Sequence, residues 1–173
     1  MKKILLALFI LSSACCLSQK SVTTDIYLLS DTNTPKKVGA VKITDTLEGL
    51  LFNVNLEHIP QGEHGFHIHE NGSCAPLYQS NGIILLAGMA GAHYDPYNTK
   101  QHLGPNGGGH KGDLPYLIAN QKGQVKTKFY HPHLTLDEIK NRTLVIHQCG
   151  DNYQDLPQPL GGGGGRIACG VIP

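Results

Sequence analysis

The chain has 173 residues and a formal net charge of +1 at pH 7. This length suffices for one domain with a buried core, and a near-neutral chain without a basic cluster argues against nucleic-acid binding as the main role. The apolar run near the N-terminus is well short of the roughly 20 residues that cross a bilayer, and no second run is long enough, so we expect no transmembrane segment.

The N-terminal residues have the pattern of a secretory signal. Residues 2–3 are charged, residues 4–11 form a short apolar run, and residues 12–14 are small. We therefore predict a signal segment over residues 1–14, cleaved near 14–18. The alternative is a buried N-terminal helix.

The five cysteines divide into two groups. Cys15 and Cys16 stand at the predicted cleavage site, where one of them could carry a lipid that tethers the chain to a membrane without spanning it. Export implies an oxidising compartment, in which disulfides persist. Cys74, Cys149 and Cys169 lie in the body of the chain, so at least one of these three is unpaired.

Beyond residue 20, short apolar runs rich in Val, Ile, Leu and Tyr alternate with Gly, Pro, Asn and Asp, a pattern typical of strands and turns. A glycine-containing turn at 120–123 predicts a hairpin between two of these runs. Thr135 and Glu138 can form the capping box of one helical turn. We predict strands over 26–29, 38–43, 50–56, 65–69, 116–119, 125–130, 143–147 and 167–172.

Two regions lack the strand pattern. Residues 70–115 are rich in Gly, Asn, Pro and His, and residues 148–166 contain five consecutive glycines from Gly161 to Gly165. Loops of this length are uncommon in a small domain and are usually functional. The sequence therefore predicts an all-β domain over residues 21–173, an antiparallel sandwich or barrel with two long functional loops.

His67 and His69 lie two residues apart in a predicted strand. Because successive side chains of a strand point to opposite faces, both rings project to the same side. Neutral imidazole binds copper, zinc, iron and nickel, so the pair forms half of a transition-metal site. His64 falls on the other face by the same alternation, and we expect it to hydrogen-bond to a neighbouring backbone group.

The first long loop contains three histidines and an aspartate at irregular spacings: His93, His102, His110 and Asp113. No helix or strand face unites them, but a loop can fold around an ion and bring them together. Three imidazoles and one carboxylate suit tetrahedral zinc. A single loop histidine is better interpreted as a solvated polar residue, but that interpretation is poor for three with an aspartate.

Six segments have spacings that are specific when taken together. They are HGFHIHE at 64–70, GAHYDP at 91–96, HLGP at 102–105, HKGDLP at 110–115, RTLVIH at 142–147 and GRIACGVI at 165–172. In this order they resemble the copper/zinc superoxide dismutases, in particular the type that bacteria export. The resemblance covers essentially everything after the signal segment.

The resemblance implies an eight-stranded antiparallel Greek-key barrel, or flattened sandwich, with one copper and one zinc ion per subunit. His93 would bridge the two ions as an imidazolate, a deprotonation that two nearby cations make reasonable. The implied copper ligands are His67, His69, His93 and His147, and the implied zinc ligands are His93, His102, His110 and Asp113.

The resemblance assigns further roles. Asp151 would hold one copper ligand and one zinc ligand together, as the outer carboxylate of a metal site does. Cys74 and Cys169 would form a disulfide that anchors the first loop to the last strand. Cys149 has no counterpart in the family; it is either a buried thiol or one that oxidises or mispairs.

The implied activity is the conversion of superoxide into oxygen and hydrogen peroxide by Cu(II)/Cu(I) cycling, with zinc in a structural role. Arg166 would attract and orient the anion through its permanent charge and rigid donor fork, and His93 would take up and return a proton. The chain departs from the family in its loop charges, because no lysine lies between His147 and Arg166. Lys100 and Lys111 would compensate if they face the cavity.

The implied partner is the superoxide anion, with no nucleic acid, and the chain would be a monomer or a homodimer in the bacterial periplasm, unless a lipid tethers it. The main alternative is a non-enzymatic exported protein that stores or delivers copper or zinc on the same scaffold. Loss of a copper ligand or of Arg166 would favour that alternative, and neither is lost. His58, His131 and His133 match no metal motif, and we expect them at the surface.

Overall fold

The computed structural model describes residues 19–30 and 35–173. The predicted signal segment, Cys15 and Cys16 lie outside these residues. Within the described part, no helix combines the length and the apolar character needed to cross a membrane.

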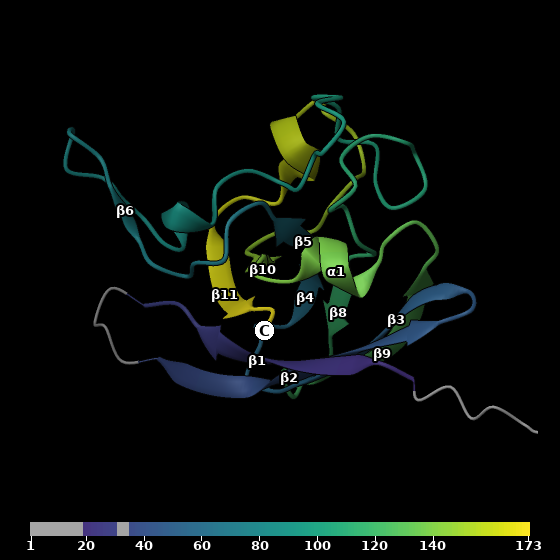
Figure 1. Cartoon of the computed structure of the whole chain (residues 1–173). Coiled ribbons are helices and arrows are strands. Elements are labelled where there is room, and N and C mark those ends of the chain that lie inside the picture. Colours follow the sequence, from purple (N-terminus) through teal and green to yellow (C-terminus); the bar gives the residue numbers. More distant parts are fainter. Residues whose placement is uncertain (1–18, 31–34) are drawn as a thin grey trace, which may run out of the picture.

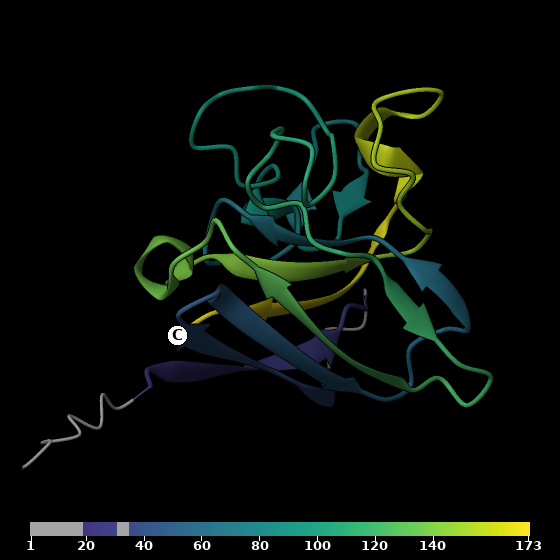
Figure 2. The same ribbon diagram turned by 90° about the vertical axis from the view of Figure 1, so that its right-hand side faces the viewer.

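The barrel strands are β1 (Ser21–Leu28), β2 (Lys36–Thr46), β3 (Gly49–Leu56), β4 (Gly62–His64), β5 (Phe66–His69), β8 (Leu117–Ala119), β9 (Val125–His131), β10 (Thr143–His147) and β11 (Arg166–Val171). One sheet has the order β5-β10-β11-β1-β2-β3-β9, and β4 pairs separately with β8. Only Gly65 separates β4 from β5, so these are two parts of one bent strand. Figures 1 and 2 show the strands curled around a common interior.

Counted in this way, the eight-stranded antiparallel barrel is confirmed. The connections are of the Greek-key kind, because β4 follows β3 in the chain but pairs with β8, and β9 returns to pair with β3. The barrel interior is filled by alternate side chains of each strand. In β3 the inward side chains are Leu50, Phe52, Val54 and Leu56, all fully or almost fully buried. Burial of each such side chain contributes about 1.5–3 kcal/mol.

All the predicted strands are present, although β1 begins earlier than predicted, at Ser21. The hairpin prediction is partly wrong. The chain does reverse after β8, where Asn120 N donates to Gln124 O at 3.0 Å. However, β8 pairs with β4 and β9 pairs with β3, so the turn is a corner between two sheets.

The predicted helical turn is confirmed as α1 (Leu136–Ile139). Its capping box is complete. Glu138 N donates to Thr135 Oγ1 at 3.3 Å, and Thr135 N donates to Glu138 Oε2 at 2.9 Å.

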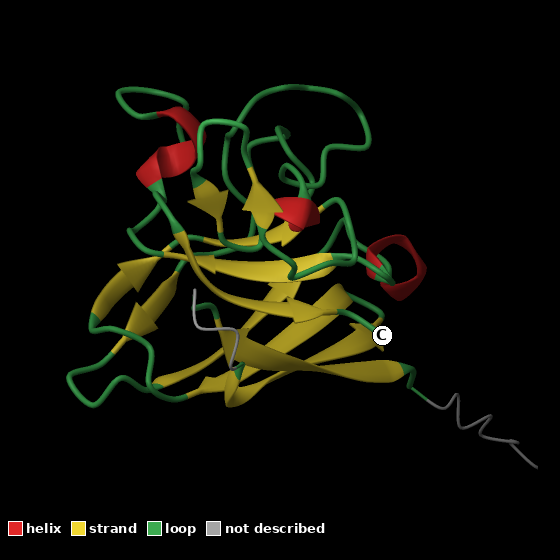
Figure 3. Cartoon of the chain, turned by 90° about the vertical axis from the view of Figure 1, so that its left-hand side faces the viewer, coloured by secondary structure: helices red, strands yellow, loops and turns green. Residues whose placement is uncertain are grey.

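The two long loops contain short elements that the sequence did not predict: β6 (Leu77–Tyr78), β7 (Ile84–Leu85) and the 3-10 turns η1 (Gly88–Ala90) and η2 (Pro159–Gly162). Strands of two residues carry too little periodicity to be recognised. Figures 1 and 2 show both loops on the same side of the barrel, and Figure 3 shows that this side is mostly loop.

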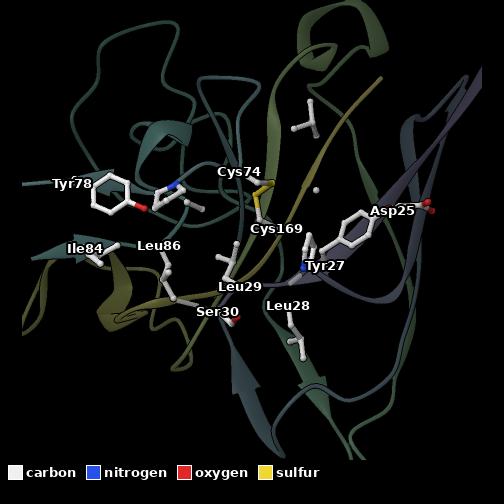
Figure 4. A pocket seen from close by; sticks show the side chains of 15 residues that line it. Asp25, Tyr27, Leu28, Leu29, Ser30, Cys74, Tyr78, Ile84, Leu86 and Cys169 are labelled. Carbon is white, nitrogen blue, oxygen red and sulfur yellow. A yellow bond between two sulfur atoms is a disulfide. The ribbon is translucent and has the colours of Figure 1, made fainter. Parts of the chain in front are cut away.

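The Cys74–Cys169 disulfide is confirmed and joins the first long loop to β11. Beside it lies a hollow of about 650 Å³ with mostly apolar walls, formed by β1, β11 and the β6–β7 region (Figure 4). None of the predicted metal ligands lines this hollow.

One alternative is excluded and one minor expectation is wrong. Cys149 is a free cysteine and is exposed, so of its two alternatives the buried thiol is excluded. His131 is only 3% exposed, because it lies at the end of β9, where it pairs with Leu50. His58 and His133 are exposed as expected.

Candidate metal centre

Strand β5 is covered on both faces. Phe66 and Ile68 point into the hydrophobic core, whereas His67 and His69 point to the side that the long loops cover. His147 ends the neighbouring strand β10, and its N–H donates to Gly65 O at 2.8 Å. The ring centroid of His147 lies 4.8 Å from that of His67 and 5.6 Å from that of His69. Two adjacent strands thus place three buried imidazoles together.

The first long loop lies against the same strand. Ile68 N donates to Gly112 O and Tyr94 N donates to Ile68 O, each at 2.8 Å. Isolated bridges place His93 opposite His69 and Asp113 opposite His67. The loop therefore carries its candidate ligands to the histidines of β5.

Each imidazole of the first group has one ring nitrogen bonded to the protein. His67 Nε2 donates to Asp151 Oδ2 at 2.7 Å, His69 Nδ1 donates to Gly91 O at 2.9 Å, and His147 Nδ1 donates to Gly164 O at 3.3 Å. These bonds fix the tautomer and leave the other nitrogen of each ring as a lone-pair donor. The free Nε2 atoms of His69 and His147 lie 3.4 Å apart.

The second group surrounds Asp113. Its Oδ1 lies 3.0 Å from His93 Nδ1 and 3.5 Å from His110 Nδ1, and its Oδ2 lies 2.9 Å from His102 Nδ1. His102 Nε2 donates to Asp151 Oδ1 at 2.7 Å. Asp151 therefore bonds to one imidazole of each group.

Among the described residues, two sets of possible ligand atoms lie within 4.8 Å of one another: His67, His69, His93 and His147, and His67, His93, His102 and Asp113. His93 and His67 belong to both sets. His110 belongs to neither, although its ring centroid is 5.3 Å from that of His93 and 5.9 Å from that of His102.

The residues fit copper and zinc. Within residues 19–30 and 35–173, His67 Nδ1, His102 Nδ1, His110 Nδ1 and Asp113 Oδ2 are buried without a hydrogen-bond partner. The short His102–Asp113 contact therefore lacks hydrogen-bond geometry. An unsatisfied buried polar atom costs about 1–3 kcal/mol, and bound cations would satisfy these atoms. Imidazole and carboxylate donors suit zinc, and an all-imidazole set suits copper.

Burial keeps the imidazoles of the first group neutral. It lowers the pKa of His67, His69 and His147, and it lowers the pKa of His93 to about 3. Neutral imidazole is the form that binds a metal ion.

The two aspartates have the opposite behaviour. Burial alone would raise the pKa of Asp113 and of Asp151, but the imidazoles close to each carboxylate, first of all that of His102, hold both values well below the usual range. Burial would lower the pKa of His102, but its short contacts with the two carboxylates raise it to about 9. The buried carboxylates thus favour positive charge here, which a proton or a metal ion can supply.

The glycine run packs against the site and is not a free linker. A Cβ at Gly161 would lie 1.9 Å from Asp151 Oδ1, and a Cβ at Gly163 would lie 3.2 Å from His147 Cβ. Gly161 also has a φ of 71°, which disfavours other residues. The backbone can approach the ligands this closely only because these positions lack side chains.

Arg166 lies beside the first group. It pairs with His147 in the strand register, and its guanidinium donates to Ala87 O at 2.5 Å and to Gly91 O at 2.6 Å. Gly91 O also accepts the bond from His69, so one carbonyl oxygen joins the two side chains. Burial lowers the pKa of His69 and of His147 most, and neighbouring histidines lower it further. The positive charge of Arg166 adds to this lowering.

Of the two loop lysines, Lys111 adds little free positive charge. Lys111 bonds to Glu138 on α1 and lies over the ring of Tyr97 at 5.7 Å. Its charge is therefore balanced by a carboxylate. Lys100 is exposed, and its backbone N–H donates to Asp95.

His64 has the backbone contacts that we expected. Its ring nitrogens lie 2.8 Å from His147 O and 2.7 Å from Pro60 O. Sequence reasoning missed Asp155, whose carboxylate accepts the His102 N–H at 2.9 Å. It also missed the carbonyl groups of Gly91 and Gly164, because backbone acceptors leave no mark on a sequence.

The comparisons agree with this geometry. The family model described as "Copper/zinc superoxide dismutase (SODC)" matches residues 37–172. A protein from Brucella abortus named "Superoxide dismutase [Cu-Zn]" is 53% identical over 154 residues, which are 88% of each chain.

Two solved structures are similar over nearly the whole barrel. The Cu/Zn superoxide dismutase from Brucella abortus has a TM-score of 0.85 at 53% identity and covers 89% of this chain and 100% of that chain. The monomeric copper, zinc superoxide dismutase from Salmonella enterica has a TM-score of 0.79 at 46% identity with the same coverage. With a family match over most of its length and relatives above half identity, this chain belongs to the copper/zinc superoxide dismutase family.

Proposed function

We propose that the chain is a superoxide dismutase that binds one copper and one zinc ion per subunit. The observation that carries this proposal is the pair of ligand sets that share His93. The proposed copper ligands are His67, His69, His93 and His147, and the proposed zinc ligands are His93, His102, His110 and Asp113.

The hydrogen bond of the His67 side chain supports its assignment to only one of the two sets. Its Nε2 is bonded to Asp151, so only Nδ1 is free and the ring can serve one ion. We assign it to copper, with its strand neighbours His69 and His147. The zinc set then needs a fourth donor, and the buried, unpartnered Nδ1 of His110 beside Asp113 supplies it.

When bound, copper supplies the one-electron redox chemistry that converts superoxide into oxygen and hydrogen peroxide, while zinc is structural. Arg166 attracts the substrate. A guanidinium has five N–H donors, and two donors are held by backbone carbonyls, so others remain to orient a small anion. Its contact with Gly91 O, shared with His69, fixes the charge next to the copper ligands.

His93 is the proposed proton carrier. Its Nδ1 faces Asp113 Oδ1 at 3.0 Å, so Nε2 is the atom directed to the copper set. Nε2 can take up a proton and return it to the reduced product, while Asp113 and the neighbouring loop hold the ring in place. The isolated bridge with His69 holds the backbones of the two residues side by side.

The test is to express the chain, purify the mature protein and load it with copper and zinc. Both metals are then counted, and the rate of superoxide removal is measured. We expect one ion of each metal per chain and rapid removal of superoxide. A protein that binds both metals but does not accelerate superoxide loss would instead be a storage or delivery protein, and the proposed function would be wrong.

We also propose that residues 1–14 direct export to the bacterial periplasm. The Cys74–Cys169 disulfide supports this, because disulfides persist in oxidising compartments. Intact mass of the protein from a periplasmic extract tests the cleavage site, and a mass increase at Cys15 or Cys16 would identify a lipid anchor. Sedimentation of the same sample decides between a monomer and a homodimer.

A further inference from the structure

We propose that Arg142 is a positioning residue of the metal centre, which aligns the segment that carries His93 with the strand that carries His69. This inference rests on the proposed metal ligands. Arg142 does not contact the imidazoles and has no part in the proton or substrate steps described above.

The guanidinium of Arg142 makes three contacts at once. Its Cζ lies 3.7 Å from the centroid of the Tyr94 ring, Nη1 donates to Glu70 O at 2.7 Å, and Nε donates to Glu138 O at 2.7 Å. Tyr94 directly follows His93, and Glu70 directly follows His69. One rigid group therefore touches the next residue along the chain from each of two proposed copper ligands.

The surrounding bonds transmit this alignment to the ligands. Glu70 N donates to Ala92 O at 3.0 Å, and Ala92 N donates to the Glu70 side chain at 3.0 Å. Glu70 therefore bonds to both backbone groups of Ala92, the residue before His93. Tyr94 is 7% exposed and is bonded through its backbone to Ile68 and Gly112, which precede His69 and Asp113. A shift of the Tyr94 ring would move His93 relative to both ligand sets.

Only arginine can make this combination. A planar guanidinium stacks on an aromatic face and donates in fixed directions within its plane, whereas an ammonium group is a point charge on a flexible stem. Lysine would keep the charge but could not stack on Tyr94 and at the same time reach the carbonyls of Glu70 and Glu138. Arg142→Lys therefore separates geometry from charge.

The experiment compares three proteins loaded with copper and zinc: the natural protein, Arg142→Lys and Thr135→Ala. Thr135→Ala removes the N-terminal cap of α1, the helix whose Glu138 O accepts from Arg142. The loss should cost about 1 kcal/mol of stability. Because Thr135 does not contact Tyr94 or Glu70, this variant is the control for general destabilisation. The readouts are the Cu(II) EPR spectrum and the rate at which a chelator removes zinc. For Arg142→Lys we expect altered Cu(II) parameters and zinc loss faster on the order of tenfold, with neither change in Thr135→Ala.

Identical EPR spectra and zinc-loss rates for Arg142→Lys and the natural protein would overturn the inference, as would equal changes in Thr135→Ala. If Arg142→Lys does not fold, Tyr94→Leu and Tyr94→Phe replace it. Tyr94→Leu removes the ring and should alter the EPR spectrum, whereas Tyr94→Phe removes only the hydroxyl and should not. Identical spectra for the two variants would overturn the inference. None of these readouts uses superoxide. A natural protein that holds both metals but lacks activity would contradict the proposed function and leave the role of Arg142 intact.

Discussion

The Nε2 atoms of His69 and His147 lie 3.4 Å apart, and each ring is held by a hydrogen bond from its other nitrogen to a backbone carbonyl. Burial keeps both rings neutral, so each Nε2 presents a lone pair to the same space. A copper ion between them would be bound by both nitrogens.

Replacing His147 is the most selective change for copper. In His147→Ala we expect copper to be lost, zinc to be retained and superoxide removal to fall to background, because the zinc ligands do not include this residue. Metal content by plasma mass spectrometry checks the first two outcomes. His133→Ala removes an exposed histidine outside both sets and should behave as the natural protein. Full activity in His147→Ala would show that the copper ligands are wrongly assigned.

Asp151→Asn tests the link between the two ligand sets. One carboxylate accepts N–H groups from His67 and His102 at 2.7 Å each, whereas an amide accepts one and presents a donor to the other. We expect zinc affinity to fall about 10- to 100-fold, measured by competition with a chelator. Asp137→Asn, on the exposed face of α1, is the matched control. Unchanged affinity in Asp151→Asn would contradict the linking role.

The disulfide should contribute to stability and to the position of Arg166. Cys74 and Cys169 are 95 residues apart, and closure of a loop of this size removes about 4 kcal/mol of unfolded-chain entropy in the loop-closure model. In Cys74→Ser we expect a lower melting temperature and faster amide exchange near Ala87, whose carbonyl accepts from Arg166. Calorimetry under oxidising conditions is the direct measurement, with the natural protein under reducing conditions as reference. Equal melting temperatures would argue against the stabilising role.

Arg166 supplies the main positive charge near the copper set, so the rate with superoxide should depend on salt. Salt screens the attraction between exposed charges that lie farther apart than the Debye length, which is about 10 Å at 0.1 M. We expect kcat/KM to decrease as salt increases, and Arg166→Gln to have both a lower rate and a weaker salt dependence. Lys128→Gln, which changes a lysine on the outer face of β9, should keep the natural salt dependence. A rate that ignores ionic strength would rule out electrostatic guidance by Arg166.

His131 should make the protein sensitive to acid. Burial lowers its pKa in the folded chain to about 4, whereas an unfolded histidine has a value near 6.5. Between these values the unfolded chain binds more protons, so stability is complete above about pH 6.5 and is lost as the pH falls toward 4. The full effect is on the order of 3 kcal/mol.

Denaturant unfolding of the natural protein and of His131→Gln from pH 4 to 8 measures this effect. The difference in free energy of unfolding between the two proteins isolates His131 from the other buried histidines, and it should shrink as the pH falls below 6.5. His133→Gln is the control at an exposed position. A difference that is constant with pH would contradict the prediction.

The strands and the candidate ligands differ in how far sequence alone could predict them. Alternation placed His67 and His69 on one face, because strand geometry is local. Convergence of His93, His102, His110 and Asp113 depends on loop contacts with Ile68. Periodicity could not predict that these residues come together, whereas the resemblance to the family did. His131 was misjudged because its burial depends on the pairing of β9 with β3, and the exposure of Cys149 could not be predicted because it depends on how the second long loop folds. The stacking of Arg142 on Tyr94 is equally non-local.

The separation of the ligands along the chain has a consequence for biosynthesis. His67 and Asp151, which are hydrogen-bonded in the finished barrel, are 84 residues apart, so a nascent polypeptide acquires the two-metal centre only after most of it has left the ribosome. Because Gly161 and Gly163 must also pack against Asp151 and His147, tight metal capture requires the chain at least through residue 163. Fragments that stop before residue 151 should therefore be metal-poor and open to proteolysis.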